Sequence, residues 1–214
     1  MRAHHLIPLS MLLSGCSLFC AECGYLPYAE NYATPSGLPA PAAYERAEAD
    51  WSRTAAFGIN GSMRVTFESP TYQAAALAWS ADRSHLGSQE IEALLQNRWQ
   101  ERYAGGTRLP FEVSIKLDRR FYSRKQFELS EWQFSLADER GQTVLPTSVE
   151  RPQITEDEDF LNSRFIVYFP RRDAQGTMLF ESPRLLRFRS DSPLTRSDFT
   201  WRFRPLSAPL PDHG

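Results

Sequence analysis

Arginine is the residue type whose pattern in this sequence most clearly suggests a binding site. The chain contains 22 arginines and two lysines. The guanidinium group is a planar fork of donors that fits phosphate and carboxylate groups. Two arginine pairs near the C-terminal end are spaced two positions apart, so each pair shares one face of an extended strand. If those strands pair, they form an anion-binding patch on one outer surface: Arg187, Arg189, Arg202 and Arg204.

This patch has two alternative explanations. The codon usage of a GC-rich genome produces an excess of arginine without any function. Like charges placed opposite each other destabilise a sheet, so the patch requires either acidic neighbours or an anionic ligand. Glu181, Asp191 and Asp198 are close enough in sequence to be such neighbours. Neutralisation and ligand binding therefore both stay open.

Residues typical of catalytic and metal sites are sparse. After the first fifteen residues the histidines are His85 and His213, too few for a zinc cluster or a recognisable catalytic triad. No glycine-rich phosphate loop is present. The acidic run Glu156-Asp157-Glu158-Asp159 lacks the spacing of an EF-hand and is typical of a solvated loop. We expect no metal, no cofactor and no enzyme activity.

The N-terminal segment has the order of an export signal. Arg2 precedes an apolar run, residues 6–13, which is shorter than the roughly 20 residues of a membrane span. The run ends in Leu13-Ser14-Gly15-Cys16. This segment resembles the lipobox of bacterial lipoproteins, in which small residues precede the cysteine that is acylated.

The resemblance implies a processing route and an address. Residues 1–15 would be removed as a signal peptide, and Cys16 would carry the acyl chains that anchor the protein in a membrane. Ser17, rather than Asp, follows the lipidated cysteine, which in the family's sorting pattern permits transfer to the outer membrane. We therefore expect a lipid-anchored protein of the cell envelope, at the outer membrane and facing the periplasm.

Two further cysteines lie close to this anchor. With Cys16 lipidated, Cys20 and Cys23 remain as an even pair in a compartment that permits disulfides. We expect a local disulfide or two free thiols, with metal or redox chemistry and pairing to another chain as alternatives. The net charge of −2 lacks the basic footprint of a nucleic-acid-binding protein, so we expect no nucleic-acid partner.

The remainder divides into a tether, one domain and a tail. Residues 16–55 are expected to be the lipidated N-terminus and a Pro/Ala-rich linker, because prolines interrupt regular structure. Residues 56–206 are expected to form a β domain, followed by a flexible tail at 207–214. An alternation of apolar and polar residues, typical of half-buried strands, occurs in five segments: 63–67, 111–117, 132–136, 165–169 and 199–203.

Turn signals and a change of period complete the fold prediction. Turns after residues 138 and 173 predict further strands at 143–149 and 177–180, and 184–189 adds another, whereas 151–162 is expected to be a loop. Apolar residues at helical spacing predict helices at about 71–82 and 88–104. The sequence predicts a mainly β fold, an immunoglobulin-like antiparallel β-sandwich with a helical hairpin inserted between the first two strands.

These features favour a membrane-anchored envelope lipoprotein that is a non-catalytic binding or assembly module. Its partners would be an envelope protein or an anionic envelope component. One alternative is an envelope hydrolase that uses paired carboxylates, whose separation no sequence shows. Another is a carrier of an apolar ligand, which requires a cavity between the sheets or beneath the helices.

Overall fold

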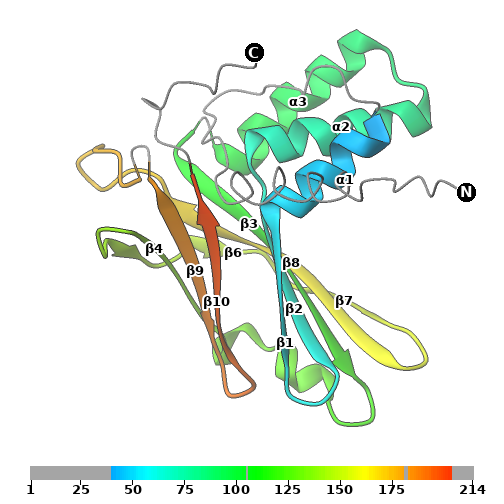
Figure 1. Ribbon diagram of the computed structural model, residues 1–214, viewed down its shortest axis with the longest axis vertical. Helices are drawn as coiled ribbons and strands as arrows, with labels where there is room; N and C mark the ends of the chain where they lie inside the picture. Colours follow the sequence, from blue (N-terminus) through cyan, green and yellow to red (C-terminus); the bar gives the residue numbers. More distant parts are fainter. Residues whose placement is uncertain (1–39, 105, 181–182, 204–214) are drawn as a thin grey trace, which may run out of the picture.

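The computed structural model describes residues 40–104, 106–180 and 183–203 (Figure 1). The lipobox with Cys16, the pair Cys20 and Cys23, Arg204 and the tail 207–214 lie outside the described residues. No helix among the described residues is long and apolar enough to cross a membrane.

Strands and helices alternate in groups along the described chain. The order is α1 (Ala40–Trp51), β1 (Ser52–Phe57), β2 (Gly61–Phe67), α2 (Pro70–Ser84), α3 (Ser88–Tyr103), β3 (Arg108–Asp118), the 3₁₀ turns η1 (Arg124–Phe127) and η2 (Leu129–Glu131), β4 (Gln133–Asp138), β5 (Thr143–Val144), β6 (Ser148–Val149), β7 (Gln153–Glu156), β8 (Phe160–Pro170), β9 (Leu185–Asp191) and β10 (Arg196–Arg202).

The strands form two antiparallel sheets. The larger sheet has the order β1-β2-β3-β8, and both β6 and β7 pair with the remaining edge of β8. The smaller sheet has the order β10-β9-β4-β5. The three helices gather at one end of the molecule, next to the larger sheet (Figure 1). The predicted mainly β fold with antiparallel sheets is confirmed.

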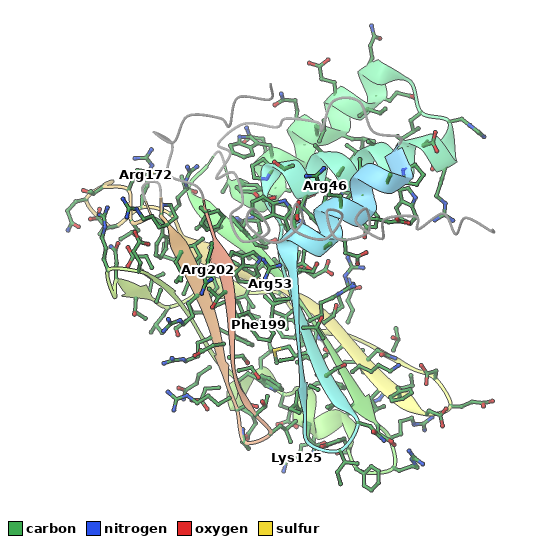
Figure 2. The ribbon with its side chains drawn as sticks, in the orientation of Figure 1. Arg46, Arg53, Lys125, Arg172, Phe199 and Arg202 are labelled. Atoms are coloured by element: carbon green, nitrogen blue, oxygen red, sulfur yellow. The ribbon has the colours of Figure 1, made fainter. Side chains whose placement is uncertain are left out.

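Aromatic side chains fill the space between the sheets. Phe111 of β3 contacts Phe67 and Phe169 of its own sheet, and Phe188 and Trp201 of the other. Each fully buried ring of this kind contributes roughly 1.5–3 kcal/mol by leaving water. Arg53 of β1 links the two sheets by donating a hydrogen bond of 3.1 Å to the carbonyl of Thr200 in β10 (Figure 2).

The linker prediction for residues 16–55 is wrong for residues 40–55. These residues form α1 and most of β1. Ala43, Ala47 and Trp51 recur every four residues and are all buried, which makes one helical face. Pro41 lies in the first turn, where a helix tolerates proline because that amide has no partner inside the helix.

Three loop and strand predictions also require correction. Residues 151–162 are not a loop, because β7 pairs with β8 in this region. The segment 143–149 divides into β5 and β6, which belong to different sheets. The segment 177–180 contributes only an isolated bridge between Arg172 and Met178. The β7–β8 pairing is a local hairpin, whereas β6 pairs with β8 about twenty residues further along the chain.

Helices are present at both predicted positions, but they follow the second strand rather than the first, because β1 was not recognised. The Ser69 hydroxyl accepts a hydrogen bond of 3.1 Å from the Tyr72 amide at the start of α2, which replaces a partner missing from the first helical turn. The Gly87 amide donates to the Glu90 carboxylate at 2.8 Å at the start of α3. Both contacts fix where the helices begin.

Candidate functional site

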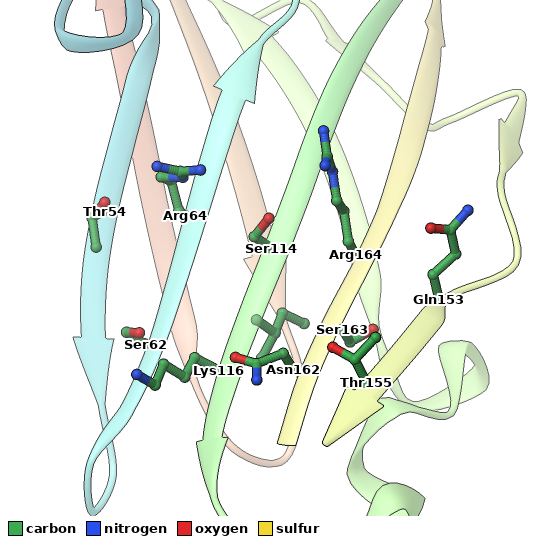
Figure 3. Close-up of a pocket in the computed structure, with 11 residues that line it drawn as sticks. Thr54, Ser62, Arg64, Ser114, Lys116, Gln153, Thr155, Asn162, Ser163 and Arg164 are labelled. Atoms are coloured by element: carbon green, nitrogen blue, oxygen red, sulfur yellow. The ribbon is translucent and has the colours of Figure 1, made fainter. Parts of the chain in front are cut away.

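A groove of about 560 Å³ lies on the outward face of the larger sheet, the face turned away from the core (Figure 3). Its walls come from β1, β2, β3, β7 and β8. Eleven residues line it: Thr54, Ser62, Arg64, Ser114, Ile115, Lys116, Gln153, Thr155, Asn162, Ser163 and Arg164. We call this surface the basic groove.

Strand register aligns most of these side chains into two rows across the sheet. Each paired residue points to the same face as its partner, and neighbouring strands are about 4.8 Å apart. The first row is Thr54, Arg64, Ser114, Arg164 and Gln153. The second row is Ser62, Lys116, Asn162 and Thr155.

The depth of the groove comes from side-chain size. Ser62 and Ser114 are short and half-buried, whereas Arg64, Lys116 and Arg164 are long and exposed. Figure 3 shows Arg64 and Arg164 on either side of Ser114. The two serines therefore form a floor, and the basic side chains stand beside it.

The charge of the lining residues has one sign. Three of the eleven are basic and none is acidic. Arg64 forms an ion pair of 2.7 Å with Glu48 of α1, and Arg164 pairs with Glu112 of β3. The Lys116 Nζ lies 3.7 Å from the centre of the Phe160 ring. A positive groove lined with hydroxyl and amide groups can bind phosphate or carboxylate.

Beyond Arg164, towards the helices, the outward face of the larger sheet is covered. Thr66, Glu112, Ile166 and Tyr168 occupy outward positions in their strands, and Glu68 follows the end of β2, yet all five are buried. The Tyr103 hydroxyl of α3 donates to the carbonyl of Glu68. The helices thus cover one half of this face and leave the basic groove open in the other half.

Glu68 is the most perturbed carboxyl group of this covered half. Burial raises its pKa to about 7, the charge of Arg102 opposes that increase, and the charge of Glu112 adds to it. The Arg102 Nε lies 3.7 Å from the Glu68 Oε2, and no hydrogen bond reaches that oxygen from the described residues. A buried carboxyl with so few partners is costly to ionise.

Glu68 and Glu112 are two nearby carboxylates, the residue type that a hydrolase would need. Neither lines the basic groove, and Glu68 is only 5% exposed. General acid catalysis requires the acid to lie within hydrogen-bond reach of the substrate. In this geometry the carboxylates position Arg102 and Arg164, and the groove presents donors for an anion.

The predicted anion-binding arginines lie on the outward face of the smaller sheet. Because β9 and β10 pair, the structure brings Arg187, Arg189 and Arg202 to one face. Arg189 faces Asp198 and donates to its two carboxylate oxygens at 2.8 and 3.2 Å. Asp198 therefore serves as one of the predicted acidic neighbours.

The other predicted positions are dispersed. Asp191 pairs with Arg196 at 3.6 Å. Arg204, Glu181 and the three cysteines Cys16, Cys20 and Cys23 lie outside the described residues. His85 ends α2 in a left-handed conformation, with φ of 55°.

The acidic run forms the end of β7 and a tight turn. The Asp157 carboxylate accepts hydrogen bonds from the Phe160 and Asp159 amides, which hold its pKa below the ordinary range. Within the described ranges, no group of three or more histidine, cysteine or acidic residues is placed to hold a metal ion.

The residues of the basic groove were not singled out from the sequence. Arg64, Lys116 and Arg164 each occupy the polar position of an alternating strand pattern, which marks them as outward-facing. Nothing in the sequence indicates that β3 lies between β2 and β8. The alternation could have placed each residue on the outward face, but only the pairing gathers them in one groove.

Comparisons with known proteins give little guidance. No protein-family model and no curated protein matches the chain. It is similar to a crystal structure of a novel protein of unknown function from Burkholderia pseudomallei, at 15% sequence identity and a TM-score of 0.42. The match covers 75% of this chain and 83% of that chain. A likeness at this level carries no argument about function.

Proposed function

We propose that this chain is an envelope lipoprotein, anchored through Cys16, whose β domain is a non-catalytic module that binds an anionic component of the cell envelope. The observation that carries the binding role is the composition of the basic groove, with three basic and no acidic lining residues. The lipobox Leu13-Ser14-Gly15-Cys16 supports the anchor, and Ser17 supports the location at the outer membrane.

Within this proposal the domain is an immunoglobulin-like sandwich. Constant-type domains of that class have sheets in the order A-B-E-D and C-F-G. The orders β2-β3-β8-β7 and β4-β9-β10 correspond to these when β2 is taken as strand A and β1, β5 and β6 as additional strands. The helices α2 and α3 would then be a hairpin inserted between strands A and B.

The two alternative functions have less support. A hydrolase would need carboxylates that reach a substrate, but Glu68 and Glu112 do not line the basic groove. A carrier of an apolar ligand would need space between the sheets. The ring of Phe111 contacts those of Phe188 and Trp201 there instead.

The anchor is tested by the mass and location of the mature protein. We expect expression in a Gram-negative host to give a membrane-bound product whose mass matches cleavage before Cys16 plus acyl chains. Cys16→Ala should abolish both the added mass and the membrane fractionation. A wild-type product without acyl chains would overturn the anchor.

The binding role is tested on envelopes freed of protein. The full chain carrying Cys16→Ala, which removes any contribution of the lipid, is sedimented with washed, protease-treated Gram-negative envelopes. We expect the triple variant Arg64→Gln, Lys116→Gln, Arg164→Gln to lose most of the bound fraction. The control Arg187→Gln, Arg202→Gln removes two exposed arginines from the other sheet and should retain it. Equal sedimentation of all three proteins would refute the groove.

A further inference from the structure

The central row of the basic groove contains two arginines separated by one strand. Arg64 on β2 pairs with Ser114 on β3, and Ser114 pairs with Arg164 on β8. Two strand spacings place the Cα atoms of the arginines about 10 Å apart. The short Ser114 side chain between them leaves the floor open. The row thus offers two guanidinium groups with a gap between them.

Each guanidinium is held in place and still has free donors. Arg64 donates from Nη1 to Glu48, and Arg164 donates from Nη2 to Glu112. A guanidinium group has five N–H donors, so one such contact leaves donors for a ligand. The side chains of Arg64 and Arg164 are 45% and 66% exposed, which keeps those donors accessible. The two acidic partners orient the arginines from outside the groove.

We propose that the basic groove takes a ligand with two anionic groups about 10 Å apart, one bound by Arg64 and the other by Arg164, with the connecting segment lying over Ser114. This inference rests on the proposed function and specifies the ligand class. Ser62, Asn162 and Thr155 in the second row offer hydroxyl and amide groups to a polar connecting segment. Lys116 lies in the second row on β3, the strand between β2 and β8, and adds positive charge beside that segment.

The spacing is tested with soluble bisphosphates of increasing length. Affinity is measured by NMR titration of the arginine Nε–H signals in the Cys16→Ala chain. Ethane-1,2-diol bisphosphate is too short to reach both arginines, whereas hexane-1,6-diol bisphosphate can span them. We expect the longer compound to bind at least about tenfold more tightly than hexyl phosphate, because the second contact becomes intramolecular. The shorter compound should gain no more than the twofold statistical factor of a second phosphate.

Single substitutions identify the two contacts. Arg64→Gln and Arg164→Gln should each reduce the affinity for hexane-1,6-diol bisphosphate to that of hexyl phosphate. Arg64→Lys keeps the charge but loses the fork, and should recover part of the lost affinity. Arg187→Gln on the other sheet is the matched control and should change nothing. A length-dependent gain that persists in Arg64→Gln and Arg164→Gln would overturn the assignment.

Two sources can present such a pair, one molecule with two phosphates or two neighbouring phospholipid headgroups. Phosphatidylglycerol vesicles that displace hexane-1,6-diol bisphosphate from the groove would identify headgroups, whereas retention of the bisphosphate would identify a single molecule. Equal affinity for all lengths, with envelope sedimentation still dependent on the groove, would refute the paired spacing and leave the proposed function intact. If envelope sedimentation did not depend on the basic groove, both the paired spacing and the proposed function would be refuted.

Discussion

The outward faces of both sheets carry arginines but differ in what lies beside each one. On the larger sheet, Ser114 lies between Arg64 and Arg164, in a groove whose lining has no acidic residue. On the smaller sheet, Arg189 lies between Ser135 and Asp198, so its acidic partner is its direct neighbour across the strands. Glu48 and Glu112, the acidic partners of Arg64 and Arg164, do not line the groove. The number of arginines therefore does not define an anion site. The residues next to each arginine on the adjacent strands define it.

The two faces also differ in how their carboxylates are placed. Glu112 and Glu68 are buried beneath the helices next to the larger sheet, whereas Asp198 lies on the open face of the smaller sheet. Exposed pairs such as Arg189 and Asp198 contribute about 0–1 kcal/mol to stability. Buried carboxylates affect stability more strongly, because ionisation beneath the helices must overcome desolvation.

The largest expected effect concerns Glu68 and pH. Its pKa is raised from 4.5 to about 7 in the folded protein, so between these values the folded state binds more protons than the unfolded state. Stability therefore falls as pH rises through this window, by ~3 kcal/mol in all. Glu68→Gln should remove this dependence, so that the variant exceeds wild type in urea unfolding at pH 8 but not at pH 4.5.

Asp198→Asn is the matched control on the other face. The hydrogen bond from Arg189 lowers the pKa of Asp198, so its contribution is present above the unfolded value of 3.8 and is lost only in more acidic solution. The Asp198→Asn variant should keep the wild-type dependence between pH 5 and pH 8. An unchanged pH dependence in Glu68→Gln would contradict the difference between the faces.

The next effect concerns the floor of the groove. Ser114→Trp fills the space between Arg64 and Arg164 and should reduce the affinity for hexane-1,6-diol bisphosphate at least about tenfold, which corresponds to ~1.4 kcal/mol. Ser135→Trp places the same side chain beside Arg189 on the smaller sheet and should leave the affinity unchanged. Both positions face outward, so urea unfolding checks that each variant folds. Equal losses in the two variants would argue against a specific floor.

A smaller effect is expected from the acidic partner of Arg64. Glu48→Gln removes the carboxylate that lies 2.7 Å from Arg64 and leaves the guanidinium less neutralised. We expect a gain of about two- to threefold in affinity for hexyl phosphate, in the range of one exposed ion pair. The gain should shrink as sodium chloride increases, because salt screens exposed charges. A loss of affinity would instead show that Glu48 is required to hold Arg64 in place.

The smallest expected effect tests whether the ion pair between Arg189 and Asp198 alone makes the smaller sheet bind anions more weakly than the basic groove. Asp198→Asn frees Arg189 beside Arg187 and Arg202, so the smaller sheet would carry three arginines without this carboxylate. We expect less than about a twofold gain in binding of hexyl phosphate, because the short Ser135 has a guanidinium on only one side. A gain that matched the affinity of the basic groove would show that charge, rather than groove shape, decides the comparison.

Local patterns in the sequence determined most of the element positions. The alternation at 63–67, 111–117 and 165–169 predicted strands that the structure contains as parts of β2, β3 and β8. Such predictions succeed because side-chain direction depends only on the residue's own strand. The α1 helix was missed because the prolines near its start outweighed the spacing of Ala43, Ala47 and Trp51.

The site, in contrast, was decided by tertiary structure. The sequence determined that Arg64, Ser114 and Arg164 face outward, and that Arg187 and Arg189 share a face. Only the pairing of β3 with both β2 and β8 placed Ser114 between two arginines, with Arg164 coming from a strand about fifty residues further along the chain. A shift of one residue in that pairing would move the outward side chains of the shifted strand to the face that packs in the core. Register is set by burial of the opposite face, so the groove depends on the whole core rather than on any local motif.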